Sequence, residues 1–275
     1  MSHDNPGTDL FKRYLGLLGV SVRKPGPEAL AELITAHLTR VPFENISKLY
    51  CRKRDNLRYL PDLDKYLDGI EHFNFGGTCY SSNYHLYLLL EYLGYEIKLC
   101  GADMTNPDVH LVSMVKLDGR EYLVDIGYAA PFLKPLPRDL TEDYIIELGN
   151  TRYILKPQDN QGRSRLELYR DGQLKHTYIA NPKPRQIEHF ADIITQSYSD
   201  EATFMNSLLL IRFFPNRSLA IHNLNLVESQ GTKAKITPIA DRTELIKAIE
   251  KHFGIPANIA AEAIAQLGEL QDAWS

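Results

Sequence analysis

The segment Phe75-Gly76-Gly77-Thr78-Cys79-Tyr80-Ser81-Ser82-Asn83 holds two glycines, then a cysteine, then the start of an apolar run that reads as a helix to Leu93. Glycine permits backbone turns that other residues resist, so the pair predicts a sharp corner before the helix. A thiol at that corner meets the positive end of the helix dipole, which favours the thiolate. The segment therefore predicts a nucleophilic cysteine at a helix N-terminus. A small, inert, buried thiol is the alternative.

Composition narrows the class of protein. The 275 residues are 24% charged and 44% hydrophobic, with a formal net charge of −4. These values are ordinary for a soluble globular protein, and the acidic balance argues against a nucleic-acid partner. No N-terminal targeting segment is evident and no apolar run is long enough to span a bilayer, so we expect no membrane partner.

The cysteines indicate the compartment. Cys51, Cys79 and Cys100 are odd in number and lack CxxC spacing. Neither a disulfide framework nor a zinc site is indicated, so we expect a reducing, cytoplasmic location and no metal.

The order of predicted elements is helices, then strands, then a mixture. Residues 1–94 are predicted to be mainly helical, at Asp9–Leu18, Pro27–Thr39, Leu60–Ile70 and Cys79–Gly94. Residues 95–184 alternate as strands, at Glu96–Met104, Val109–Leu117, Glu121–Tyr128, Tyr153–Lys156, Arg165–Arg170 and Gln173–Ile179, with a linker at Asn181–Pro184. Residues 185–275 hold predicted strands at Leu208–Phe214, Leu219–Leu226 and Lys233–Pro238, and two helices beginning near Asp241 and Pro256. The fold class is therefore α+β, with three predicted domains.

A base for the thiol follows from strand geometry. If Asp118-Gly119 form a two-residue hairpin loop, Asp125 lies opposite Val112. His110 is two residues before Val112 and shares its sheet face, so His110 and Asp125 become diagonal neighbours with backbones roughly 7–8 Å apart. A carboxylate there would fix the imidazole tautomer and stabilise imidazolium. A polar pair on the surface is the alternative. A longer loop would also change the strand register, so that this argument for His110 and Asp125 on one face would no longer hold.

Other histidines are weaker candidates for the base that activates Cys79. His85 lies six residues along the helix of Cys79 and should point away from the thiol, whereas His72 stays open as a partner. The chain lacks GxSxG, P-loop, GxGxxG and HExxH motifs, which removes the commonest serine-hydrolase, nucleotide-binding and metalloprotease classes.

With Cys79, His110 and Asp125 in this order, the chain resembles the arylamine N-acetyltransferase family over nearly its whole length. The motifs that carry the resemblance are Val41-Pro42-Phe43-Glu44-Asn45, Gly76-Gly77-Thr78-Cys79 with Asn83, Val109-His110-Leu111, Leu123-Val124-Asp125-Ile126-Gly127-Tyr128, and Phe204 through Leu226. The resemblance implies an N-terminal helical bundle, a central β-barrel and a C-terminal α/β lid, around a cysteine-protease-like Cys-His-Asp core. It also implies acetyl-CoA as the co-substrate of a ping-pong reaction.

The resemblance further implies the site residues. Cys79 would carry the acetyl group as a thioester, with His110 and Asp125 as catalytic partners and an arylamine or hydrazine as acceptor. Substrate or cofactor binding would fall to Phe43, Gly127, Tyr128, Ala129 and Phe204.

Three positions depart from the family's pattern. Phe75 stands where the family has Arg, Ser81 where it has Glu or Gln, and Ala129 where it usually has Gly. Loss of a buried cation would leave Glu44 without a partner, so we expect Glu44 to have another donor or to reach solvent. The methyl group of Ala129 would obstruct close approach to a ligand.

Four functions compete at this level. The leading one is an acyl-CoA:amine N-acyltransferase. The others are an amide synthase that takes its acyl chain from an acyl carrier protein, a cysteine amide or ester hydrolase, and a binding scaffold without catalysis. The three triad residues argue against the last.

Overall fold

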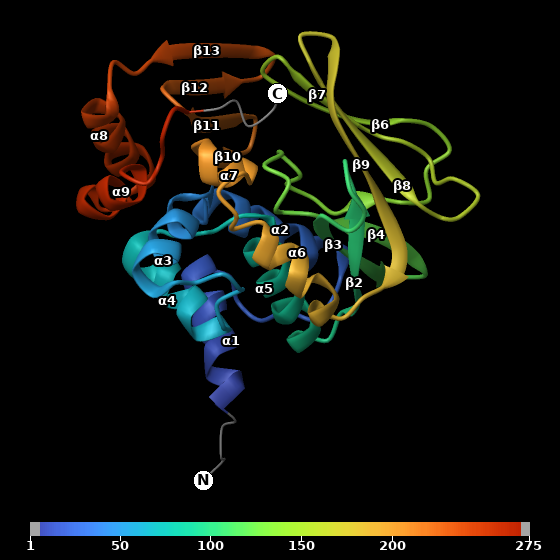
Figure 1. Ribbon diagram of the computed structural model, residues 1–275. Helices are drawn as coiled ribbons and strands as arrows, with labels where there is room; N and C mark the ends of the chain where they lie inside the picture. Colours follow the sequence, from blue (N-terminus) through green and yellow to red (C-terminus); the bar gives the residue numbers. More distant parts are fainter. Residues whose placement is uncertain (1–5, 271–275) are drawn as a thin grey trace.

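The computed structural model describes residues 6–270 and shows helices below, a large curled sheet to one side and a smaller sheet above (Figure 1). Five helices form the N-terminal bundle: α1 (Pro6–Leu18), α2 (Pro27–Arg40), α3 (Ile46–Asp55), α4 (Leu63–Phe73) and α5 (Cys79–Tyr92). These helices share one hydrophobic core, in which one leucine from each of four helices is fully buried: Leu18, Leu30, Leu67 and Leu89. The helical bundle is confirmed.

The sheet that follows is antiparallel and has eight strands. In spatial order they are β5 (Leu136–Pro137), β4 (Arg120–Val124), β3 (His110–Leu117), β2 (Glu96–Asp103), β9 (Gln173–Pro184), β8 (Ser164–Arg170), β7 (Thr151–Leu155) and β6 (Tyr144–Leu148). β5 and β6 are its edges and do not pair with each other, so the sheet is a curled half-barrel. The expectation of a central β-barrel is therefore confirmed only in part, as an open half-barrel.

The second sheet combines one short strand from the N-terminal third of the chain with four strands from the C-terminal third. Its order is β1 (Phe43–Glu44), β10 (Leu209–Phe214), β11 (Arg217–His222), β12 (Asn225–Gln230) and β13 (Lys233–Pro238). β1 comes from the N-terminal third and pairs with β10 through Phe43 opposite Ile211. The last helices, α8 (Arg242–Phe253) and α9 (Ala257–Ile264), pack beside this sheet, and η1 (Ile187–Phe190), α6 (Ala191–Gln196) and α7 (Thr203–Asn206) lead into it.

The predicted hairpin has the predicted register. Leu117 pairs with Arg120 and Ser113 with Val124, so Asp118 and Gly119 form a two-residue loop. Both loop residues have positive φ, 51° and 78°, as a type I′ turn requires. This register brings His110 and Asp125 to one face of the sheet.

Several predicted boundaries are wrong. The linker at Asn181–Pro184 is part of β9, which extends to Pro184 and pairs with both β8 and β2 across an irregularity near Cys100. The strand at Leu219–Leu226 is two strands, because Asn223 turns the chain with φ of 49°.

The helix α3 was not predicted. Its C-terminal half is basic and exposed, and only Ile46, Lys48, Leu49 and Tyr50 are buried, which gives too short an apolar pattern. The short strand β5 and the strand β6 were also not predicted.

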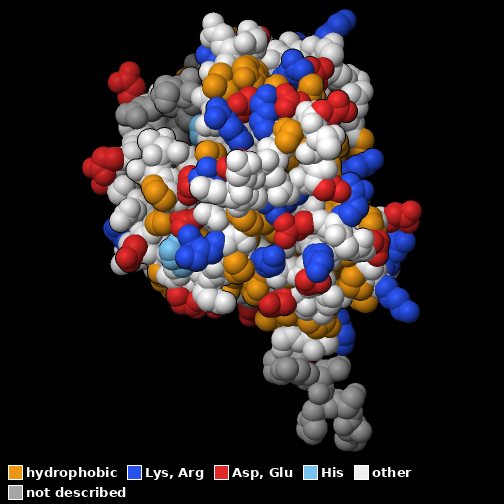
Figure 2. Space-filling view, turned by 90° about the vertical axis from the view of Figure 1, so that its right-hand side faces the viewer, with side chains coloured by type: hydrophobic (Ala, Val, Ile, Leu, Met, Phe, Trp, Pro, Cys, Tyr) orange, Lys and Arg blue, Asp and Glu red, His pale blue; other side chains and the backbone are white. Residues whose placement is uncertain are grey.

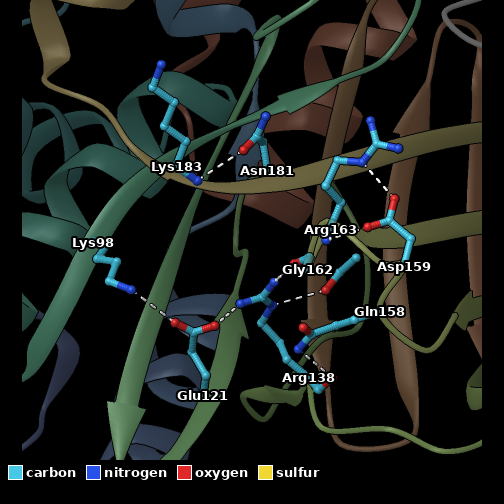
Figure 3. A network of polar contacts seen from close by, with 10 residues as sticks. Lys98, Glu121, Arg138, Gln158, Asp159, Gly162, Arg163, Asn181 and Lys183 are labelled. Carbon is cyan, nitrogen blue, oxygen red and sulfur yellow. Dashed lines mark hydrogen bonds and ion pairs between the residues drawn. The ribbon is translucent and has the colours of Figure 1, made fainter.

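A buried arginine ties the outer part of the half-barrel together (Figure 3). Arg138 is 2% exposed; its guanidinium contacts Glu121 and the carbonyl of Gly162 and donates to Ser164 Oγ at 3.0 Å. Lys98 Nζ lies 3.2 Å from the other oxygen of Glu121. A buried charge is tolerated when it is paired and hydrogen-bonded, as this one is.

Basic and acidic side chains are interspersed on the face shown in Figure 2, and neither sign forms a continuous patch there. Every helix within residues 6–270 is too short or too polar to cross a bilayer.

We predict that Gly76→Ala destabilises the fold. A Cβ at Gly76 would lie 1.9 Å from the carbonyl oxygen of Pro42, so the backbone must shift at a cost of about 1–3 kcal/mol. Gly16→Ala in α1 is the control: it meets no atom within 4 Å and should stabilise by about 0.5–1 kcal/mol. Urea unfolding measures both, and equal stability of the two variants would contradict the close approach at Gly76.

We predict that His37 makes the fold acid-sensitive. Burial, and then the charge of His85, lower the pKa of His37 from 6.5 to about 3. The folded-state pKa lies below the unfolded one, so stability is complete above pH 6.5 and is lost as pH falls. At pH 5 the loss is about 2 kcal/mol. His37→Gln should reduce the fall in unfolding free energy between pH 7 and pH 5 by that amount, and an unchanged fall would refute the assignment.

Candidate active site

The corner before Cys79 is held by the carboxylate of Glu44. This side chain is 0% exposed and accepts backbone N–H groups of Gly76 at 3.0 Å, Gly77 at 2.8 Å and Ser47 at 2.8 Å. Burial raises the pKa of Glu44, and these hydrogen bonds oppose that rise. The expected replacement for the family's cation is thus confirmed: backbone amides take its place.

The glycines allow this arrangement. Gly77 has φ of 73°, in the left-handed region that favours glycine, and Gly76 has room for no Cβ. Thr78 is then the N-cap of α5, and Cys79 is its first residue, partly exposed. The thiol stands at a helix N-terminus as the sequence predicts.

The imidazole and the carboxylate meet as the strand parity predicts. His110 Nε2 donates to Asp125 Oδ2 at 2.8 Å, and both residues are almost fully buried, at 1% and 2% exposure. Because Nε2 is engaged by Asp125, Nδ1 is the nitrogen left for the thiol. The rings of Tyr178 and Tyr128 lie against the imidazole, with centroids 5.3 Å and 5.8 Å away.

Asn83 joins the helix of the thiol to the strands of the other two groups. Its amide donates to Asp125 Oδ1 at 2.9 Å and to the carbonyl of Leu111 at 2.5 Å, and its oxygen accepts the N–H of Ile126 at 2.9 Å. Asn83 is one turn after Cys79 on α5, so these bonds fix the position of the helix relative to His110 and Asp125.

The electrostatics favour a protonated imidazole. Burial lowers the pKa of His110, but the charge and hydrogen bond of Asp125, followed by the hydrogen bond and charge of Cys79, raise it well above its usual range. The net direction is upward, because a buried carboxylate at 2.8 Å outweighs the loss of water. The geometry therefore supports a protonated imidazole beside the thiol of Cys79.

The other two thiols have a different environment. Burial raises the pKa of Cys51 to about 12 and that of Cys100 to about 11. Both are therefore protonated and poorly nucleophilic at neutral pH.

Among the predicted binding residues, Gly127 packs directly against Cys79. A Cβ there would lie 2.6 Å from Cys79 Cα and 2.7 Å from Asn83 Nδ2. Gly127 N also donates to Asp125 Oδ1 at 3.0 Å. Only glycine permits this close packing between the strand end and α5.

The remaining four separate into two groups. Phe43, Ala129 and Phe204 pack together with Leu209, and the rings of Phe43 and Phe204 are 5.6 Å apart. Ala129 has φ of 57°, a conformation that suits glycine better, which accords with the usual residue of the family. Tyr128 instead lies in the core of the half-barrel, 4% exposed, with its hydroxyl 2.7 Å from Nδ1 of His176.

The alternative histidines are accounted for. His85 is buried in the bundle, where its ring nitrogens lie 2.8 Å from the Ser81 carbonyl and 3.2 Å from the Pro61 carbonyl. His72 is exposed near the end of α4. Within residues 6–270 no cluster of metal-ligating side chains is found.

Two residues near the site were missed. Tyr178 was not singled out, although it lies on a predicted strand and its side chain faces the core, against the ring of His110. Lys48 was missed because α3 was missed.

A groove separates the two sheets. It has a volume of about 270 Å3, and Ala129, Leu209, Arg170 and His222 are among its lining residues. It therefore reaches the cluster of Phe43, Ala129 and Phe204.

We predict selective alkylation of Cys79. Iodoacetamide at pH 6.5 should label Cys79 and spare Cys51 and Cys100, because their protonated thiols react slowly. His110→Ala should slow labelling about 10- to 100-fold, since a free thiol is only about 1% ionised at that pH. Peptide mass spectrometry identifies the labelled residue; equal labelling of the three cysteines would count against an activated nucleophile.

Comparison with known proteins places the chain in a family. The family model described as "N-acetyltransferase" matches residues 28–262. The chain is 26% identical to arylamine N-acetyltransferase, pineal gland isozyme NAT-10, of Gallus gallus, covering 59% of this chain and 62% of that protein. It is 25% identical to arylamine N-acetyltransferase 1 of Homo sapiens, covering 72% and 75%, and 32% identical to proansamycin X synthase of Amycolatopsis mediterranei, covering 40% and 44%. The chain thus spans less than two thirds of the Gallus gallus relative and three quarters of the human one.

Solved structures share the fold. Arylamine N-acetyltransferase from Salmonella typhimurium superposes with a TM-score of 0.79 at 18% identity, covering 94% of this chain and 98% of that one. The Mycobacterium marinum enzyme in complex with CoA gives 0.77 at 19% identity, covering 93% and 97%. With a family model that matches most of its length, this chain belongs to the N-acetyltransferase family, which includes the arylamine N-acetyltransferases of Gallus gallus and Homo sapiens.

Proposed function

We propose that the protein transfers an acetyl or short acyl group from an acyl-CoA to the nitrogen of an arylamine or hydrazine through a thioester on Cys79. The observation that carries this proposal is the buried hydrogen bond between His110 and Asp125 at 2.8 Å, held beside the first residue of α5 by Asn83. A protonated imidazole next to that thiol is the state that begins such a reaction.

In the first half-reaction the sulfur of Cys79 attacks the carbonyl carbon of the donor thioester. The C–S bond to CoA breaks as the new C–S bond forms, and His110 gives its proton to the departing CoA thiolate. Backbone N–H groups at the start of α5 would donate to the developing oxyanion, a contribution typically worth a few kcal/mol. The acyl group keeps its thioester energy, because one thioester replaces another.

In the second half-reaction the amine attacks the Cys79 thioester. The neutral imidazole of His110 accepts the proton of the amine, and the carbon–sulfur bond breaks to release the amide and the thiolate. Asp125 holds the ring through Nε2, so Nδ1 faces the reacting atoms throughout.

The acceptor is expected beside the cluster of Phe43 and Phe204, because aromatic side chains offer stacking and edge contacts to an aromatic amine. The groove between the sheets begins at this cluster, at Ala129, and is the proposed path for the acyl donor. A structural relative that was solved in complex with CoA supports a CoA thioester as donor.

An amide synthase is a second candidate. The similarity to proansamycin X synthase favours it, as does the methyl group of Ala129, which lines the proposed path of the donor. Such an enzyme would use the same triad and take its acyl chain from a carrier protein.

We predict that brief incubation with acetyl-CoA, without acceptor, adds one acetyl group to the peptide that contains Cys79. Cys79→Ser and Asp125→Asn should accumulate none in the same time, whereas Cys51→Ala should match the unaltered protein. Mass spectrometry of the digested protein measures the gain.

Addition of aniline to the acetylated protein then distinguishes the functions. Acetanilide as product supports N-acetyl transfer, and free acetate supports a hydrolase. Absence of acetylation, with rapid iodoacetamide labelling retained, supports a carrier-bound donor and the amide synthase.

A further inference from the structure

A second cavity lies on the helical side of the nucleophile, between α3, α4 and the segment that leads into α5. Its volume is about 550 Å3, within the range of small-molecule sites. Gly77, Thr78 and Ser81, which flank Cys79, form one part of its wall. The groove between the sheets has a different lining, so this cavity is a separate space.

Aromatic rings make up much of the wall. The ring of Phe75 packs 6.0 Å from Tyr50 and 5.3 Å from Phe73, centroid to centroid, and Tyr198 also lines the cavity. Such walls suit an apolar or aromatic body of a ligand.

One buried cation belongs to this wall. Lys48 is 6% exposed, its Nζ donates to Ser197 Oγ at 2.7 Å, and the same atom lies 4.3 Å from the centre of the Tyr198 ring. Among residues 6–270, no carboxylate lies within ion-pair distance of Lys48. Burial lowers the pKa of Lys48 to about 8, the charge of Cys79 opposes this fall, and the charge of Arg52 adds to it.

The comparison with Arg138 shows how unusual this is. The buried guanidinium of Arg138 has a carboxylate, a carbonyl and a hydroxyl as partners (Figure 3). Lys48 has one hydroxyl and one ring. A buried charge with so few partners is costly, which favours a ligand that supplies the missing anion.

The other charges around the cavity leave it positive. Arg54 and Lys65 line it together with Asp55 and Asp68, and Asp68 is already paired with Arg13 at 2.7 Å. Phe75 and Ser81, the two departures from the family's pattern next to Cys79, both line this cavity. Two of the three departures from the family's pattern thus lie in one cavity, and the third, Ala129, lines the groove between the sheets.

We propose that this cavity is a binding site for a small carboxylate with an aromatic body, whose anion pairs with Lys48 while its ring packs against Tyr198 and Phe75. The site does not depend on acyl transfer, because Cys79 does not line it.

Fluorine NMR titration of the full chain at pH 7 tests the proposal, with para-fluorobenzoate as probe and para-fluorobenzamide as its uncharged counterpart. The benzoate is expected to bind at least tenfold more tightly than the benzamide. Lys48→Met should weaken the binding of the benzoate about 10- to 100-fold, which is the usual effect of losing a charge-assisted hydrogen bond. Lys53→Met, on the exposed side of the same helix, should change the affinity for the benzoate less than twofold.

Two further measurements make the outcome decisive. A cooperative thermal transition of Lys48→Met shows that the variant is folded, and the benzoate–benzamide comparison in the unaltered protein needs no variant. In crystals soaked with para-bromobenzoate, bromine in the cavity would support the site. Bromine beside Cys79 instead, equal affinity for the two probes, or unchanged affinity in folded Lys48→Met would overturn the proposal.

Discussion

The carboxylate of Asp125 is where the helical part and the sheet part of the molecule are joined. It accepts His110 Nε2–H, the amide of Asn83 and the N–H of Gly127, all within 3.0 Å. Three donors around one buried anion offset its desolvation and leave little freedom to any of them. The same hydrogen bonds that hold α5 on the sheet therefore set the distance between thiol and imidazole.

A second buried carboxylate, that of Glu44, holds the backbone turn before α5 in place. Glu44 accepts the N–H groups of Gly76 and Gly77, and its own strand, β1, pairs with β10 of the C-terminal sheet. One short segment thus connects the bundle, the nucleophile and the second sheet. With Phe75 at the position of the family's arginine, backbone N–H groups supply the positive partners of Glu44.

The buried charges of Glu44, Arg138 and Lys48 differ in how many hydrogen-bonded partners they have. Glu44 and Arg138 have three or more hydrogen-bonded partners each, whereas Lys48 has one hydroxyl and one aromatic ring. A buried ammonium in this condition lowers stability unless its proton is lost or an anion arrives. Its position beside an aromatic cavity makes the helical face of the protein chemically distinct from the groove between the sheets.

The sequence by itself determined the local geometry. The two glycines before Cys79 predict the corner, and Asp118-Gly119 fix a strand register that places His110 beside Asp125, because both signals act over a few residues. Periodicity did not reveal α3, the continuation of β9 through Asn181–Pro184 or the turn at Asn223, since the first is mostly polar and the others interrupt a pattern that looks continuous. Only the tertiary structure decided that α5 meets the sheet through Asn83, that Glu44 takes backbone amides in place of a cation, and that Lys48 faces no carboxylate. These depend on contacts between residues 28 to 149 positions apart in the chain, as the bonds from Asn83 to Leu111 and from Lys48 to Ser197 illustrate. No short-range pattern encodes such distances.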